Sequence, residues 1–165
     1  MDKSPSTKKG QMSSVDFLFA SIIFVFILAF FTGFWYVTTG DLDNTIKRNR
    51  LEATAVVASD LLIKSPGVPS NWTENPSTIL AIGLVSQHNV FDKIKLENFT
   101  SLDYNSSSEL LGLSQSQGFY FYIEDLDGNR KYQTGNSSAN GQVVFITRYG
   151  ILNGQKVKMR LMIYE

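Results

Sequence analysis

The sequence predicts an α+β protein in which a long N-terminal hydrophobic and amphipathic helix precedes a small antiparallel β-rich head. Three patterns lead to this prediction. Residues 17–37 form an uncharged apolar run, and residues 41–63 repeat apolar positions at close to the helical period. Residues 118–165 are rich in β-favouring side chains around two hairpin-turn signals. A chain of 165 residues is long enough for one small domain and an appendage.

The composition argues against several classes of function. The chain has 15 lysines and arginines and 15 aspartates and glutamates, so a net charge of zero gives no evidence for a nucleic-acid partner. It has no cysteine, and His88 is its only histidine, so neither a thiolate nor a two-histidine metal site can be built. We expect His88 at the surface. With no phosphate-binding loop and no nucleophile elbow, we expect neither an enzyme nor a cofactor.

The apolar run from Phe17 to Val37 is long enough to cross a membrane as a helix. At about 1.5 Å per residue, such a helix spans roughly the 30 Å hydrocarbon core of a bilayer. A secretory signal has a shorter apolar region of about 7–15 residues, followed by a cleavage site with small residues. The segment "TTGDLDN" after Val37 matches such a site poorly. We therefore expect a helix that is retained in the cell membrane.

Flanking residues predict the orientation of this helix. Trp35 and Tyr36 lie at its far end, where aromatic side chains with a polar tip favour the membrane interface. Lysines in a short flanking segment favour the cytoplasmic side. Those before the run are Lys3, Lys8 and Lys9. The basic residues among 47–50 weaken the argument but lie further away. We expect a single-pass protein with a cytoplasmic N-terminus and an extracellular C-terminal head.

Four tripeptides after the apolar run fit the acceptor pattern for N-glycosylation. Their asparagines are Asn71, Asn98, Asn105 and Asn136. The tripeptide at Asn75 is excluded by its proline. Glycans at these positions would fit an exported head. The alternative is that the tripeptides reflect polar loops without any glycan.

Residues 40–65 are expected to continue the membrane helix outward as an amphipathic helix. Its apolar positions are Leu42, Ile46, Ala53, Val57 and Leu61. We expect this helix to cover the sheet of the head, because neither apolar face can stay exposed. Pro66, Gly67 and Pro69 then end the helix, and Trp72 packs the resulting turn against the head.

The exported head is expected over residues 66–165, with antiparallel strands from about 118 to 165. Before them, residues 77–113 read as extended, short helical or irregular pieces. The segment 124–129, "EDLDGN", clusters carboxylates but lacks the spacing of a calcium loop, so we expect a hairpin turn there. Asn153-Gly154 predicts a second hairpin. In the last strand, apolar residues from Val157 to Ile163 alternate with basic ones, which is typical of a half-buried strand.

The residues before the apolar run resemble a processing site. Lys8-Lys9-Gly10-Gln11, followed by Ser13, Asp16 and the run, resembles the class III signal of archaeal type IV pilin-like proteins. The "SPGVPSNW" turn after the long helix is also similar to that family. In the family, a prepilin peptidase cuts before the hydrophobic helix, which is retained. The resemblance implies a cut between Gly10 and Gln11, a basic leader of residues 1–10, and a transmembrane and filament-core helix at 11–39.

Asp16 is where the chain departs from the family pattern. The family's carboxylate is usually a glutamate at the fifth position after the cut, whereas Asp16 is sixth. One residue corresponds to a rotation of about 100° around a helix. Two roles for Asp16 remain open. One is the family's role in recognition or assembly, and the other is a helix-start residue that the helix dipole favours.

The resemblance implies a structural cell-surface protein, either a subunit or a minor component of an extracellular type IV pilus. It also implies the partners: membrane lipid before assembly, a prepilin peptidase, homotypic or other pilin subunits, and a pilus assembly ATPase with its membrane platform. The alternative is a single-pass membrane-anchored domain that acts as a binding module without a filament.

Overall fold

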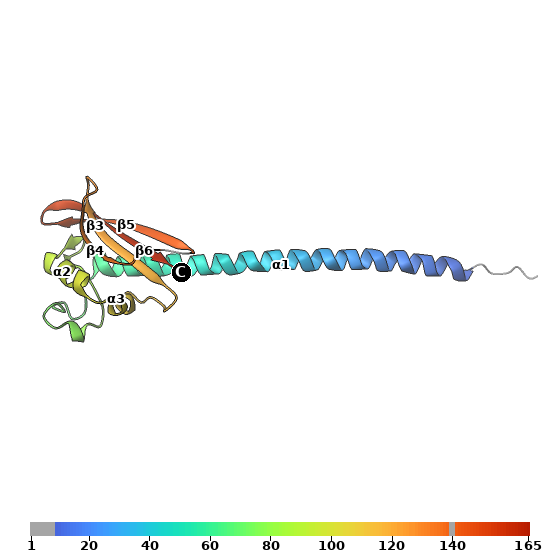
Figure 1. The fold of residues 1–165 in the computed structure, drawn as a ribbon, viewed down its shortest axis with the longest axis horizontal. Coiled ribbons are helices and arrows are strands. Elements are labelled where there is room, and N and C mark those ends of the chain that lie inside the picture. Colours follow the sequence, from blue (N-terminus) through green and yellow to red (C-terminus); the bar gives the residue numbers. More distant parts are fainter. Residues whose placement is uncertain (1–8, 139–140) are drawn as a thin grey trace, which may run out of the picture. The chain divides into compact units, whose positions relative to one another are not determined.

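The computed structural model describes residues 9–138 and 141–165, with side chains at all of these except residues 9–14, 41, 43 and 77. It has the predicted α+β fold: a long N-terminal helix is followed by a six-stranded sheet (Figure 1). The chain divides into two compact units, of which one ends at Ile46 and the other begins at Lys47. Helix α1 (Lys9–Lys64) contributes to both units.

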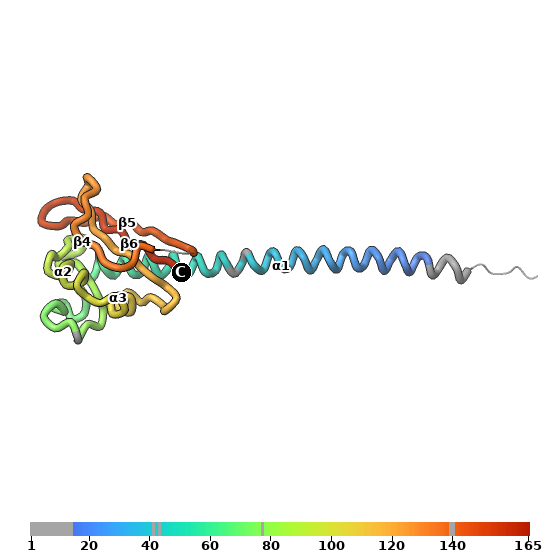
Figure 2. Tube along the Cα trace, viewed as in Figure 1, coloured from blue at the N-terminus to red at the C-terminus, as the bar shows by residue number. Residues whose placement is uncertain are grey.

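The second unit contains the last turns of α1 and all the remaining elements. The elements between α1 and the hairpins are the 3₁₀ helix η1 (Pro76–Thr78), β1 (Val85–Gln87), β2 (Val90–Phe91), α2 (Lys93–Ser101) and α3 (Tyr104–Leu110). The hairpin strands are β3 (Gly118–Asp125), β4 (Arg130–Gly135), β5 (Val143–Leu152) and β6 (Gln155–Tyr164). The tube in Figure 2 follows the same path along the chain.

The sheet has the strand order β1-β2-β5-β6-β3-β4. The four predicted antiparallel strands are confirmed, because β3 pairs with both β4 and β6, and β5 pairs with β6. The sequence did not predict the two short strands beside them. Strand β2 pairs with β5 in parallel, at Val90 with Ile151 and Phe91 with Leu152, so the complete sheet is mixed.

Both hairpin turns form where the sequence predicts them. Asn153 and Gly154 have φ angles of 51° and 77°, as a two-residue turn of the Asn-Gly type requires. In the acidic turn, Asp125 Oδ1 accepts hydrogen bonds from the backbone N–H groups of Asp127 and Asn129. These bonds lower the pKa of the Asp125 carboxyl, and the side-chain hydrogen bond from Asn129 contributes most. The turn thus uses its carboxylate to close itself.

The buried face of α1 differs from the predicted one. The residues buried in the core are Leu51, Ala55, Ala58 and Leu62. They follow the helical spacing and join the apolar side chains of β3 and β6, among them Phe121 and Leu161. Ala53 and Val57, which we expected against the sheet, are exposed. The helical period alone allowed two faces, since Ala53 and Ala55 point about 160° apart.

The turn that ends α1 is anchored as predicted. The helix ends at Lys64, and Trp72 is completely buried. Trp72 Nε1 donates a hydrogen bond of 3.0 Å to the carbonyl oxygen of Gly83. A Cβ at Gly83 would lie 2.1 Å from the carbonyl oxygen of Ser65, so only glycine fits this close crossing of two backbones. The indole therefore secures the turn and has no surface for a ligand.

Candidate functional sites

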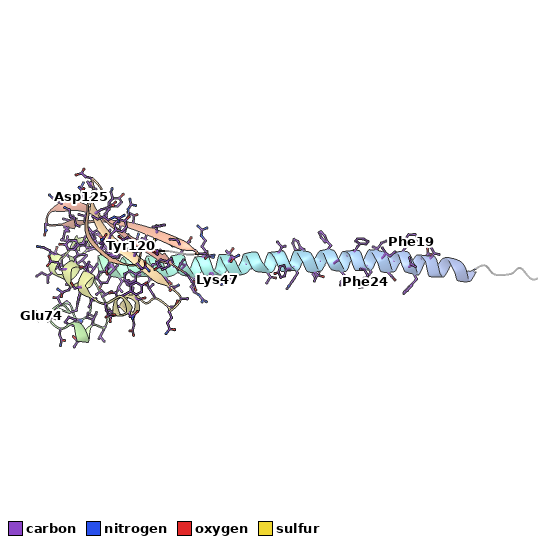
Figure 3. All side chains as sticks on the ribbon, in the orientation of Figure 1. Phe19, Phe24, Lys47, Glu74, Tyr120 and Asp125 are labelled. Atoms are coloured by element: carbon purple, nitrogen blue, oxygen red, sulfur yellow. The ribbon has the colours of Figure 1, made fainter. Side chains whose placement is uncertain are left out.

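The apolar part of α1 is exposed on every side. From Val15 to Gly40, every residue whose side chain is described is exposed, except the half-buried Ser21. Phe17 is 75% exposed and Tyr36 82%. Phe19 and Phe24 project from different sides of the helix (Figure 3). A helix that is apolar all round is suited to lipid or to the interior of a larger assembly. Among the described residues, α1 is the one helix long and apolar enough to cross a membrane.

Three hydroxyl side chains in this part of α1 bond to their own helix. Ser21 Oγ donates to the carbonyl oxygen of Phe17 at 2.8 Å, and Thr39 Oγ1 donates to that of Trp35 at 2.7 Å. Thr32 Oγ1 donates to the carbonyl oxygen of Leu28. The hydroxyl protons of these three side chains are therefore satisfied without water, as a hydrocarbon environment demands.

The predicted processing site is only partly described. Lys8 lies outside the described residues, and for Lys9, Gly10 and Gln11 the description covers the helical backbone alone. Asp16 is described and exposed, in the same helix as the apolar run. Lys9, Gly10 and Gln11 thus share the start of α1 with Asp16, and the two roles considered for Asp16 both remain predictions.

The four predicted glycosylation sites lie in different local structures. Asn71 is exposed in the turn after α1, where its Nδ2 donates to Glu74 Oε2 at 2.9 Å. Asn136 is exposed just after β4, and its Oδ1 accepts from the backbone N–H of Ser138 at 2.9 Å. Both lie in irregular backbone at the surface, where a modifying enzyme has access.

The other two sites lie in helices. Asn98 is half-buried in α2, and its Nδ2 donates to the carbonyl oxygen of Ile94 at 2.9 Å. Asn105 is exposed in α3, but the third residue of its tripeptide, Ser107, is completely buried. The sequence pattern is the same at all four positions, whereas access to the acceptor is not.

A groove with a mixed polar and apolar lining runs beside the exposed face of α1 in the second unit. Its volume is about 680 Å³, and its lining includes Val57, Leu61, Leu80 and Leu111. Val57 is 67% exposed and Leu80 is 81% exposed. The helical spacing of Val57 and Leu61 predicted an apolar face correctly. The prediction that the sheet covers this face was wrong for Val57, which stays exposed, whereas Leu61 is half-buried and packs against the core.

The outer face of the sheet combines aromatic and cationic side chains. The guanidinium carbon of Arg130 lies 4.5 Å from the ring centre of Tyr122, and that of Arg160 lies 6.0 Å from it. Glu124, almost completely buried, balances part of this charge, with Arg160 Nε at 3.3 Å and Lys158 Nζ at 3.8 Å from its Oε1. Arg160 Nε makes an ion pair here without hydrogen-bond geometry. Sequence reasoning missed this cluster because it depends on cross-strand register.

No group of three histidine, cysteine, aspartate or glutamate side chains in the described part of the chain is placed to hold a metal ion. His88 is exposed, as expected. Comparisons of the chain with protein families, with curated proteins and with solved structures find no match in any of the three.

Proposed function

We propose that the chain is a type IV pilin-like cell-surface protein, a structural subunit or minor component of an extracellular filament. In this proposal, a prepilin peptidase cuts between Gly10 and Gln11 and leaves the apolar helix in place. The cytoplasmic N-terminus and the extracellular head follow from the flanking lysines. The partners are membrane lipid, the peptidase, other pilin subunits, and an assembly ATPase with its membrane platform.

The observation on which the proposal rests is a helical segment that is exposed and apolar all round and that follows Lys-Lys-Gly-Gln after a short spacer, residues 12–16. Removed from water, each large side chain gains roughly 1.5–3 kcal/mol. Lipid and sister helices both supply an apolar surrounding, so the same helix suits the membrane and a filament core. The free-energy difference between these two states is small, because lipid tails are as apolar as leucine. Apolar burial alone therefore does not drive the helix out of the membrane, and its transfer into a filament requires a dedicated machine.

The groove of the second unit supports assembly with other subunits. Val57 and Leu80 remain exposed after the head has completed its own core. Exposed apolar clusters of this kind are typical of protein–protein contacts. In the proposed filament, a neighbouring subunit covers Val57 and Leu61.

The test is N-terminal mass spectrometry after co-expression with an archaeal prepilin peptidase. The proposal expects Gln11 as the new N-terminus, and no cleavage in Gly10→Val. Gly33→Val is the matched control, since Gly33 lies in the same helix with open space around its Cα. This control should be processed like the original chain. A chain that keeps its leader, or a Gly10→Val variant that is still cut, would overturn the proposal.

A membrane-anchored binding module without a filament is the second candidate. It is favoured by the compact second unit, which has its own core and begins at Lys47. Electron microscopy of cells that carry the complete assembly machinery distinguishes the two. Filaments labelled by an antibody to the head support the pilin proposal, and head labelling confined to the membrane supports the anchored module.

A further inference from the structure

Strand β5 has an unpaired edge over most of its length. On one side, β6 pairs with it from Val143 to Leu152. On the other side, the only described strand is β2, which reaches no further than Ile151 and Leu152. Within residues 9–138 and 141–165, no strand pairs with this side of β5 from Val143 to Tyr149.

The hydrogen bonds at the two ends of β5 show which residues face this edge. Gln142 and Glu165 exchange two backbone hydrogen bonds of 3.0 Å. The even-numbered residues of β5 therefore direct their backbone N–H and C=O groups toward β6. The N–H of Ile151 donates in the opposite direction, to the carbonyl oxygen of Asn89 at 2.8 Å. Successive residues of a strand alternate in this direction. The residues that aim their N–H and C=O groups at the free edge are therefore Val143, Phe145, Thr147 and Tyr149.

The same residues carry the exposed side chains of the strand. Phe145 and Tyr149 are each 66% exposed, and Val143 is 36% exposed. Native sheets usually protect an edge with charged side chains, prolines or bulges, and this edge has none of them. The one charged residue of β5, Arg148, points to the other face, where its Nη2 lies 2.8 Å from Asp60 Oδ1. By contrast, the opposite edge strand, β4, carries Arg130 and Lys131.

We propose that this edge pairs, in antiparallel orientation, with the same edge of a second copy of the chain. Only an extended strand satisfies a row of alternating N–H and C=O groups, so neither a helix nor a small ligand suits the edge. The side chains at the free edge carry no charge, and Arg148 is paired with Asp60, so the edge meets its own copy without like-charge repulsion. The pairing joins two heads through one self-complementary surface. It does not rest on the filament proposal.

The length of the free segment determines the register. Pairing centred on Ile146 uses the whole segment from Val143 to Tyr149 and avoids β2. It places Phe145 opposite the second copy's Thr147, and Val143 opposite its Tyr149. Each pair then joins an aromatic with a β-branched side chain, a combination that stabilises antiparallel strands. A shift toward Ile151 would place the second strand against β2.

Disulfide cross-linking tests this pairing directly, because the chain has no cysteine of its own. Full-length Phe145→Cys is mixed with full-length, mass-tagged Thr147→Cys in detergent micelles and oxidised. The mixed disulfide should form faster than with the control pair Phe145→Cys and Gln133→Cys, since Gln133 is exposed on β4, away from the free edge. Equal cross-linking rates for the two mixtures would overturn the proposal. Equal rates are also the result expected if the helices alone bring the heads together.

Edge-blocking variants provide the second arm, with Val143→Cys and Tyr149→Cys as the reporter pair. Thr147→Pro removes an N–H that faces the free edge and costs no bond to β6. Thr147→Lys keeps the backbone intact and adds a charge at the edge. Either change should lower the cross-linking rate by about tenfold, which corresponds to roughly 1.4 kcal/mol. Thr147→Val is the matched control and should leave the rate unchanged.

Circular dichroism identifies which blocked variant keeps its fold, and that variant decides the result. Cross-linking that persists in a folded Thr147→Pro or Thr147→Lys variant would refute the edge pairing. Processing at Gly10 is read separately by mass spectrometry, so failure of the edge pairing is distinguishable from failure of the proposed function.

Discussion

The ammonium nitrogen of Lys95 lies 2.6 Å from the carbonyl oxygen of Pro66 and 3.1 Å from that of Val85. One cation thus joins α2 to the turn after α1 and to β1. Lys95 is only 7% exposed. Burial lowers the pKa of its ammonium below the usual 10.5, and the charge of Asp92 opposes this shift. The side chain therefore holds three segments together while its charge is partly desolvated.

Lys95→Met should destabilise the head by about 1–3 kcal/mol, because the carbonyl of Val85 loses its partner. The wild-type chain also gains stability as pH rises from the lowered pKa toward 10.5, because the unfolded chain binds more protons there. The variant lacks this gain, so the difference between the two unfolding free energies should grow with pH. Urea unfolding at several pH values measures it, and a difference that stays constant would contradict the prediction.

Trp72→Phe should also destabilise the head. The indole is completely buried, and its Nε1 donates to the carbonyl oxygen of Gly83. Phenylalanine leaves that carbonyl unpaired and the site underfilled, which we expect to cost about 1–3 kcal/mol. Chemical unfolding followed by circular dichroism provides the measurement. Trp35→Phe is the matched control, since Trp35 is exposed. A similar loss in both variants would argue against a structural role for the Trp72 hydrogen bond.

Tyr164→Phe should make the head less sensitive to alkali. Burial and the neighbouring Tyr104 hydroxyl raise the pKa of Tyr164 to about 12, from 10.0. The unfolded chain loses this proton first, so wild-type stability falls as pH rises from about 10 to about 12. The variant has no phenol to titrate and should lose less over this interval. Urea unfolding midpoints of both proteins, measured from about pH 9 to about pH 12 so that the range includes both pKa values of Tyr164, test this prediction. Midpoints of wild type and variant that fall in parallel would contradict it.

Glycan occupancy should differ among the four acceptor sites. We expect Asn71 and Asn136 to be modified in preference to Asn98, because both lie in exposed, irregular backbone. The amide of Asn98 is bound to the carbonyl oxygen of Ile94 within α2. Glycopeptide mass spectrometry of the protein from an archaeal host reports each site separately. Asn98 occupied as fully as Asn136 would show that access in the folded head does not control modification.

Local signals in the sequence predicted the long helix and the hairpins. An uncharged apolar run needs no partner to identify it, and Asn153-Gly154 has the backbone freedom that its turn requires. Alternation from Val157 to Ile163 similarly identified a strand with one buried face. The apolar positions Val57 and Leu61 were recognised, but the sheet that was expected to cover them leaves Val57 exposed.

The sequence by itself therefore determined the apolar helix, the succession of a helical part by a β-rich part and the two hairpins, because each depends on residues close together along the chain. Only the tertiary structure decided which face of α1 enters the core and which edge of the sheet stays unpaired. Both depend on contacts between distant residues, such as Arg148 with Asp60 and Ile151 with Asn89. Helical and strand periodicity identify apolar positions, but a compact head has a single core, and the positions it leaves outside remain available to other molecules.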